Sequence, residues 1–235
     1  MARAAFVSDL HLFARRSHGE RHLPVLKTTA REVEHFILGG DIFDFRWATV
    51  SPHAAIDSAV SWLRDLSLEA PRCRMHFLLG NHDDHRELVA RLPGLAEELP
   101  NFNWHRFYLR LGDAVFLHGD AADRKLTADR LAQRRKRFRH HARAPWRHDA
   151  YHWLVKSRID QLLCRAVHPR KLVVRRLVAY LRDIGHGPED GVQSVYFGHT
   201  HRELNGYRHA GLVFHNGGAP IGSAKFRILR GEVGE

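Results

Sequence analysis

The chain has 235 residues, with 44% hydrophobic and 27% charged residues, which fits one large globular domain or two small ones and argues against disorder. Its formal net charge of +11 favours an anionic partner such as a nucleic acid, a lipid surface or a phosphorylated substrate, although a basic solvated surface would give the same value. With two cysteines, no secretory signal and no apolar run of the roughly 20 residues that a membrane span needs, we expect a cytoplasmic protein without a disulfide framework.

Residues 1–120 alternate short apolar runs, which indicate strands, with stretches of helical spacing. This alternation predicts an α/β architecture. Helices are predicted over residues 53–68, after Pro52, and over residues 86–98, with an interruption at Pro93-Gly94. Gly112-Asp113 is expected to join residues 108–111 and 114–117 in a hairpin.

Residues 121–185 have a different character, because glycine is absent up to residue 184 and apolar residues recur at helical spacing over 124–141, 149–168 and 172–181. This segment separates His118 from His199, which belong to the same predicted site. We therefore expect a helical, basic cap inserted into one domain that spans residues 1–235. Strands are predicted again over residues 194–197, 212–215 and 225–229.

Five of the apolar runs end in residues that commonly bind metal ions. They are followed by Ser8-Asp9-Leu10-His11, Gly40-Asp41, Gly80-Asn81-His82-Asp83, His118-Gly119-Asp120 and Gly198-His199-Thr200-His201. Ligands bind beyond the carboxyl ends of strands in α/β sheets, so these tips are expected to converge. In Asp9-x-His11 and His199-x-His201, alternation along a strand would direct both side chains to the same side.

Seven side chains are predicted metal ligands: Asp9, His11, Asp41, Asn81, His118, His199 and His201. They are too many for one small cation but suit two cations that share the carboxylate of Asp41. An oxygen and imidazole set without thiolate favours manganese, iron or zinc over magnesium or calcium. Two cations about 3.5–4 Å apart would orient phosphoryl oxygens, offset developing negative charge and activate a water for in-line attack on phosphorus.

Taken in order, these motifs resemble the D-x-H, G-D, G-N-H-D, H-G and G-H-T-H motifs of the calcineurin-like metallophosphoesterase superfamily. The resemblance covers about residues 4–229 outside the cap, and it implies two facing mixed β-sheets flanked by helices. It implies one metal held by Asp9, His11, Asp41 and His201. It implies a second metal held by Asp41, Asn81, His118 and His199.

The same resemblance implies that His82 contacts the scissile phosphate or protonates the leaving group, whereas a tight turn is the alternative interpretation of Asn81-His82. Asp44, Asp83, Asp84 and Asp120 are interpreted as helix caps or as partners that orient a histidine. Arg86 and Arg202 are predicted substrate contacts from their positions beside the motifs.

Within the superfamily, the chain is similar to the UDP-2,3-diacylglucosamine diphosphatase group of lipid A biosynthesis. The similarity rests on residues 7–12, on Ile42-Phe43-Asp44 with a tryptophan close behind, on Arg202 and on the basic cap. It implies hydrolysis of a nucleotide-sugar pyrophosphate bond with two Mn²⁺ ions, Fe and Zn being alternatives. It also implies a peripheral position on the cytoplasmic face of the inner membrane and a cap that helps to hold acyl chains.

The basic run at residues 134–139 is either a solvated helix face or a contact with phosphate or an anionic membrane. Nearby aromatic residues at 146, 151 and 153, with Leu154, would either pack in the core or enter the lipid interface. Two other functions stay open. One is a phosphodiesterase or nuclease of the same superfamily, whose cap grips nucleic acid. The other is a non-catalytic binding module on the same scaffold.

Overall fold

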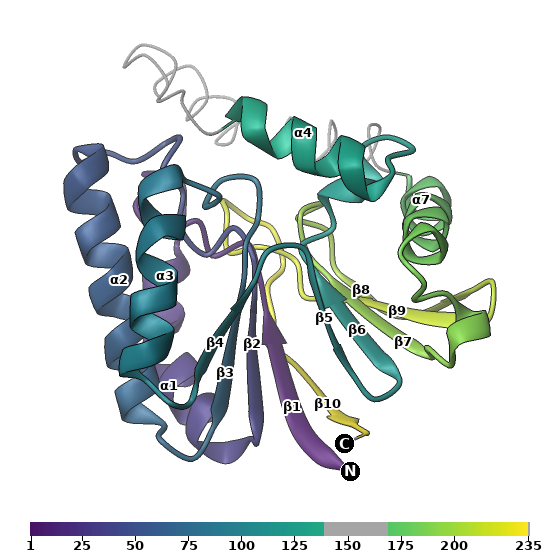
Figure 1. Cartoon of the computed structure of the whole chain (residues 1–235), viewed down its shortest axis with the longest axis horizontal. Coiled ribbons are helices and arrows are strands. Elements are labelled where there is room, and N and C mark those ends of the chain that lie inside the picture. The colour runs from purple at the N-terminus through teal and green to yellow at the C-terminus, as the bar shows by residue number, and fades with distance from the viewer. Residues whose placement is uncertain (139–168, 235) are drawn as a thin grey trace.

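Two five-stranded β-sheets face each other in the computed structural model, which describes residues 1–138 and 169–234 (Figure 1). The first sheet has the order β10-β1-β2-β3-β4, with bounds Leu229–Val233, Ala2–Val7, His35–Gly39, Arg74–Leu78 and Phe102–His105. The second has the order β5-β6-β7-β9-β8, with bounds Tyr108–Leu111, Ala114–Leu117, Ser194–Phe197, Leu212–Asn216 and Leu204–His209. Both sheets are mixed, because antiparallel strands flank parallel pairs.

Helices cover the outer face of each sheet (Figure 1). On the first sheet these are α1, α2 and α3, with bounds Leu23–Glu32, Pro52–Glu69 and Arg86–Glu98. On the second it is α7 (Arg170–Asp183), whereas α4 (Ala128–Phe138) lies across the ends of the strands (Figure 1). In the part of the chain that the structure describes, short 3₁₀ helices lie at Gly19–His22, Asp120–Ala122 and Pro188–Asp190. The α/β class and the two facing sheets flanked by helices agree with the prediction.

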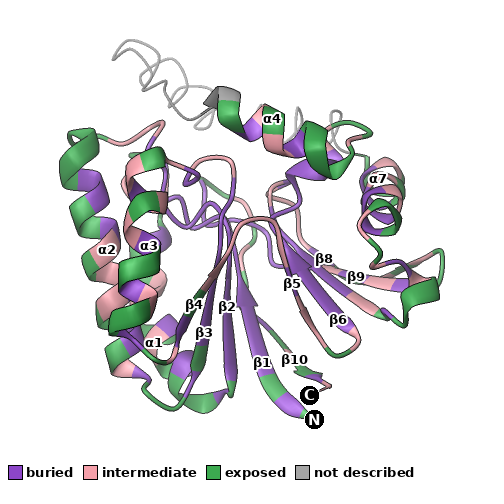
Figure 2. Ribbon diagram, viewed as in Figure 1, coloured by how far each residue is buried: buried purple, intermediate pink, exposed green. Residues whose placement is uncertain are grey.

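The central strands are buried on both faces, which explains their nearly continuous apolar runs (Figure 2). In β2, Phe36 and Leu38 pack under the helices of the first sheet, whereas Ile37 faces the second sheet. Between the sheets, the rings of Phe116 and Tyr196 stack with centroids 4.8 Å apart. The strands are therefore held rigidly where their carboxyl ends reach the loops that carry the motifs.

Several local predictions are confirmed, and two are wrong. The hairpin of β5 and β6 is present, and α2 and α3 match their predicted ranges. The helix α3 is not interrupted at Pro93, since Leu92 and Leu95 on either side are buried and hold it against the core. The strand predicted over 225–229 begins instead at Leu229, because β1 pairs with residues 229–233. The sequence also left α1, β4 and β8 unpredicted.

The structure describes only part of the predicted cap segment, residues 121–185. The helices α4 and α7 fall inside the predicted ranges 124–141 and 172–181, apart from the ends of α7. The helix predicted over 149–168 and the aromatic residues around position 150 lie outside the described residues. Side chains fasten the two cap helices together, since Asp183 of α7 accepts a hydrogen bond from the N–H of Ala128 at 3.1 Å. Among the described residues, no helix combines the length and the apolar character that crossing a bilayer requires.

Candidate metal centre

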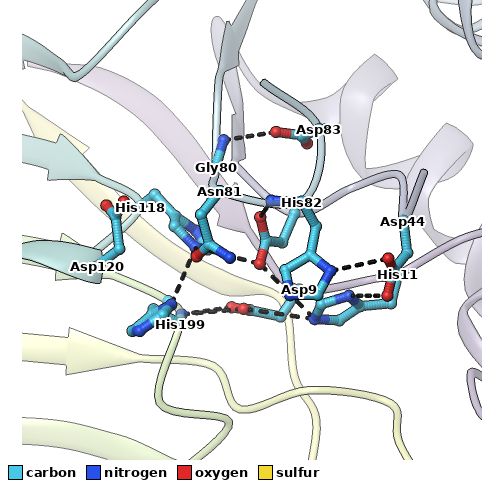
Figure 3. A network of polar contacts seen from close by, with 12 residues as sticks. Asp9, His11, Asp44, Gly80, Asn81, His82, Asp83, His118, Asp120 and His199 are labelled. Atoms are coloured by element: carbon cyan, nitrogen blue, oxygen red, sulfur yellow. Dashed lines mark hydrogen bonds and ion pairs between the residues drawn. The ribbon is translucent and has the colours of Figure 1, made fainter. Parts of the chain in front are cut away.

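The loops that follow five strands meet and bring the seven predicted ligands together. Figure 3 shows five of these ligands, namely Asp9, His11, Asn81, His118 and His199. Three of these strands, β1, β2 and β3, belong to the first sheet, and β6 and β7 belong to the second. The tips converge, as the sequence predicted. The site lies where the two sheets approach, and each sheet supplies part of it.

One group of ligand atoms comes from Asp9, His11 and His201, whose oxygen and nitrogen atoms lie within 4.8 Å of one another. The Nε2 atoms of His11 and His201 are 3.0 Å apart. Asp9 Oδ1 is 3.5 Å from His201 Nε2 and 3.9 Å from His11 Nε2. Convergence of three donors at this spacing is what one cation requires.

A second group comes from Asp41, His118 and His199, again within 4.8 Å. His118 Nε2 is 3.2 Å from Asp41 Oδ2, 3.3 Å from His199 Nδ1 and 3.2 Å from Asn81 Oδ1. Asp41 Oδ2 also lies 3.9 Å from His11 Nε2 of the first group. Asp41 therefore stands between the two groups, where a carboxylate could serve two cations.

The backbone that presents these side chains is strained. Seven non-glycine residues in the described part of the chain have a positive φ, and five are predicted ligands: Asp9, His11, Asp41, His199 and His201. Such left-handed conformations cost roughly 1–3 kcal/mol each and concentrate at functional sites. The alternation argument for Asp9 and His11 is therefore wrong. Their strand ends at Val7, and left-handed loop geometry aims the two side chains.

Two glycines allow the loops to close around the carboxylates. A Cβ atom on Gly80 would collide with the carboxylate of Asp41, and one on Gly198 would collide with that of Asp9. Close packing of these loops leaves Asp9 and Asp41 with 0% and 1% of their surface exposed. Burial at this level needs positive charge nearby to be tolerated.

The electrostatics of the site favour cations. Burial opposes ionisation of the two carboxyls, but the hydrogen bond with His201 and the charge of His118 hold the pKa of Asp9 below its ordinary value. His118 and His82 hold the pKa of Asp41 well below its ordinary value. Burial would lower the pKa of His118, yet Asp41 raises it to about 10. The same field would stabilise a divalent cation, so these residues fit a metal centre.

Asp44 fixes the orientation of two histidines. Its Oδ2 lies 3.1 Å from His11 Nδ1, and its Oδ1 lies 2.8 Å from His82 Nδ1. It also accepts hydrogen bonds from Arg16 Nη2 at 3.1 Å and from the N–H of Trp47 at 3.0 Å. With Nδ1 of His82 committed to Asp44, its Nε2 is the ring nitrogen left to meet a substrate. Burial lowers the pKa of His82, but Asp44 and Asp41 outweigh it and raise the pKa above its ordinary value.

Asp83 ties together the loops that carry Asp41 and Asn81. Its carboxylate accepts hydrogen bonds from the N–H of Gly80 at 2.5 Å and the N–H of Ile42 at 2.9 Å. Burial, with a contribution from Asp41, raises its pKa to about 7. The histidine-orienting role expected of Asp44 agrees with its contacts to His11 and His82, whereas the carboxylate of Asp83 holds the backbone of two loops.

The basic run on α4 contains a residue whose role the sequence did not predict. Arg135 is buried, with only 2% of its surface exposed, so it is neither a solvated residue nor free for an external anion. Its guanidinium contacts both oxygens of Asp120, at 2.8 and 2.7 Å, and donates to the carbonyl oxygens of Leu79 at 2.8 Å and Arg106 at 2.6 Å. It thus links α4 to the loops that carry Asn81 and His118. A buried Leu131 four residues earlier was the available signal that this face of α4 points inward.

Asp123 was also missed as a site residue. Its Oδ1 lies 2.7 Å from His199 Nε2, and its Oδ2 forms an ion pair with Arg134. The backbone around it is held by Arg176 of α7, which donates to the carbonyl oxygens of Ala122 at 2.8 Å and Asp123 at 2.7 Å. A carboxylate on the outer nitrogen of a ligand histidine fixes the ring and its tautomer. The first residues of the predicted cap segment therefore support the site directly.

The two predicted substrate contacts stand on different elements. Arg86 is exposed at the first position of α3. Arg202 is half-buried and lines a shallow hollow with Arg170 and Thr200. Neither lines the cavity of about 260 Å³ beside Asn81, which is described below. Their roles stay predictions.

Comparison with known proteins gives one family. The family model of the calcineurin-like phosphoesterases matches residues 2–203. Among solved structures, the chain is similar to a dimetal phosphatase from Danio rerio, with 12% sequence identity, a TM-score of 0.48, and coverage of 99% of this chain and 93% of that one. No curated protein matches the chain.

Proposed function

The chain belongs to the calcineurin-like phosphoesterase family, and we propose that it hydrolyses a phosphoric anhydride. The proposed substrate is UDP-2,3-diacylglucosamine, cleaved at its pyrophosphate bond, or a related nucleotide- or lipid-linked compound. Membership of the family makes it a metal-dependent phosphoesterase. The substrate rests on the similarity of residues 7–12, 42–44 and 202 to one group of the superfamily, and on the basic cap helices.

The observation that carries the reaction type is the arrangement of two donor groups around Asp41, with Asn81 beside His118. Asp9, His11, Asp41 and His201 would hold one cation, and Asp41, Asn81, His118 and His199 the other. When bound, the pair supplies Lewis acidity toward phosphoryl oxygens and lowers the pKa of water. The mixed oxygen and imidazole donors support Mn²⁺, with Fe and Zn as alternatives.

The protein's own groups would then orient the substrate and handle one proton. Asp44 holds the ring of His82 through Nδ1, and the ring keeps 14% of its side chain exposed. Its raised pKa favours the protonated form of His82, which suits donation from Nε2 to the departing oxygen. Asp44, with no exposed surface, retains the charge that balances the imidazolium.

The helices around the site support an anionic partner. On α7, four exposed basic residues accompany the acidic Asp183: Arg170, Lys171, Arg175 and Arg182, the last of which pairs with Glu189. We propose that these helices, with Arg86 and Arg202, help to hold a phosphorylated substrate at the anionic cytoplasmic surface of a membrane, where each basic residue contributes on the order of 1 kcal/mol. The same charge favours the alternative of a nuclease or phosphodiesterase that grips nucleic acid.

The test is release of UMP from UDP-2,3-diacylglucosamine by protein that has been stripped with a chelator and reloaded with Mn²⁺, Fe²⁺ or Zn²⁺. Asp41→Asn is the matched inactive variant, because both donor groups share that carboxylate. UMP release that depends on metal and on Asp41 supports the proposal. Absence of UMP release, together with cleavage of single-stranded DNA, RNA or a cyclic nucleotide, would assign the alternative.

A further inference from the structure

A cavity of about 260 Å³ lies directly beside the metal centre. It is bordered by Arg46, Asn81, Asp120, Asp123, Arg134 and Arg135. Arg46 comes from the loop between β2 and α2, whereas Arg134 and Arg135 come from α4. Asn81 belongs both to the cavity wall and to the predicted metal ligands. A group in this cavity would therefore be adjacent to a group on the metals.

The charges of the wall favour an anion. Three guanidinium groups border the cavity against two carboxylates, and since Arg135 balances Asp120 and Arg134 balances Asp123, the wall keeps one net positive charge. Asp120 makes the two-pronged pair with Arg135, and Asp123 contacts both Arg134 and His199. Arginine recognises phosphate more specifically than lysine does, because its planar fork can donate two parallel hydrogen bonds.

The wall formed by α4 is rigidly built. Arg135 holds it through the carbonyl oxygens of Leu79 and Arg106 as well as through Asp120, and Asp120 is itself only 4% exposed. Arg134 is consequently placed by an anchored neighbour on a helix. The cavity volume lies just under the roughly 300–1,000 Å³ of sites that enclose a whole small ligand. It suits one charged portion of a larger substrate.

We propose that this cavity binds the second phosphoryl group of the substrate, the one that is not attacked, through Arg46 and Arg134. The inference rests on the proposed anhydride hydrolysis, since a diphosphate carries two linked phosphoryl groups, one for the metals and one for the cavity. Arg46 would then determine specificity, by separating anhydrides from simple monoesters.

The test compares binding of inorganic pyrophosphate and inorganic phosphate to the Mn²⁺-loaded protein by isothermal titration calorimetry. Arg46→Met keeps the length of the side chain and removes the guanidinium, and Arg46→Lys keeps only the charge. Arg72→Met is the control, because Arg72 is exposed in the turn before β3. We expect Arg46→Met to weaken pyrophosphate binding at least tenfold and phosphate binding less than twofold, with Arg46→Lys in between and Arg72→Met unchanged.

The proposal is overturned if the wild-type protein binds both anions equally well, or if Arg46→Met weakens both anions by the same factor or neither. Thermal melting shows whether the Arg46→Met variant is folded. If it is not, the ratio of the pyrophosphate and phosphate affinities of Arg46→Lys decides the question. Kinetics separates this result from failure of the proposed function. A wild-type protein that hydrolyses no anhydride contradicts the proposed function, whereas the subsite is judged by the ratio of the two anion affinities alone.

Discussion

Replacing Arg135 by methionine should destabilise the fold far more than its position in a basic run would indicate. The substitution keeps an apolar stem of similar length and removes the guanidinium. Asp120 then loses both of its contacts, at 2.8 and 2.7 Å, and the carbonyl oxygens of Leu79 and Arg106 lose their donor. Burial opposes ionisation of Asp120, and Arg135 is the main reason that its pKa stays below the ordinary value.

The magnitude follows from the burial of both partners, which are 2% and 4% exposed. Removing one partner of a buried ion pair costs about 3–5 kcal/mol, because the other charge stays buried without compensation. Each carbonyl that loses its donor adds a penalty of about 1 kcal/mol or more, and these terms overlap. We therefore expect a loss of about 4 kcal/mol in the free energy of unfolding. In a domain of this size, that lowers the melting temperature by roughly 8–16 °C.

Urea unfolding followed by circular dichroism measures the effect, with Lys136→Met as the control. Lys136 is the exposed next residue on α4, and its substitution should change stability by no more than about 0.5 kcal/mol. Adding Asp120→Leu to Arg135→Met should recover part of the loss, because it removes the orphaned charge. A loss below about 1 kcal/mol for Arg135→Met would refute the anchoring role. A double variant no more stable than the single one would show that lost charge compensation is not the cause.

Three further outcomes follow from the site and the core. Asp44→Asn should weaken Mn²⁺ binding or lower kcat about 10–100-fold, measured by calorimetry and by steady-state kinetics, because the rings of His11 and His82 lose their orienting carboxylate. Mn²⁺ added to chelator-stripped protein should raise the free energy of unfolding by about 2.7 kcal/mol at 100 times its Kd, and Asp41→Asn should lose this gain; thermal melting at several Mn²⁺ concentrations measures it. Burial lowers the pKa of His76 from 6.5 to about 3, so between these pH values the unfolded chain binds more protons than the folded one. The contribution of His76 to the free energy of unfolding is therefore fully present above pH 6.5 and falls as the pH drops. The fall, about 1.4 kcal/mol per pH unit at most, should shrink in His76→Gln when urea unfolding is compared near pH 7.5 and pH 5.

The membership of the candidate site was accessible from the sequence, but its geometry was not. Asp9, Asp41, His118 and His199 could be grouped because each follows an apolar run, and the carboxyl ends of such runs converge in α/β folds. The reason offered for Asp9-x-His11 failed, because strand alternation does not apply past Val7. Positive φ values at these residues come from the packing of neighbouring loops, which a local pattern does not contain.

Contacts with distant parts of the chain also explain why the predictions for residues 225–229 and for the basic run on α4 differ from the structure. The run at residues 225–229 alternates as a strand does, with Phe226 and Ile228 against the core. The ladder with β1 nevertheless begins only at Leu229, which pairs with Phe6. On α4, nothing in the basic run itself distinguishes Arg135 from Arg134 or Lys136. Burial of that one arginine depends on Asp120, fifteen residues earlier, and on two carbonyl groups from other loops.

Two neighbouring residues of α4, Arg134 and Arg135, have different roles that require different surroundings. Arg135 is buried and its charge is balanced by Asp120, because it connects the loops that carry Asn81 and His118. Arg134 pairs with Asp123, which holds His199, and it borders the cavity where we place the second phosphoryl group. Loosening the Arg135–Asp120 pair should therefore disturb stability and metal binding together, whereas changes at Arg46, which lines the cavity from the loop between β2 and α2, should alter the preference between anions. The first change is read out by stability and metal binding, and the second by anion preference. If each change affects its own property, α4 acts as a fixed wall of the metal centre.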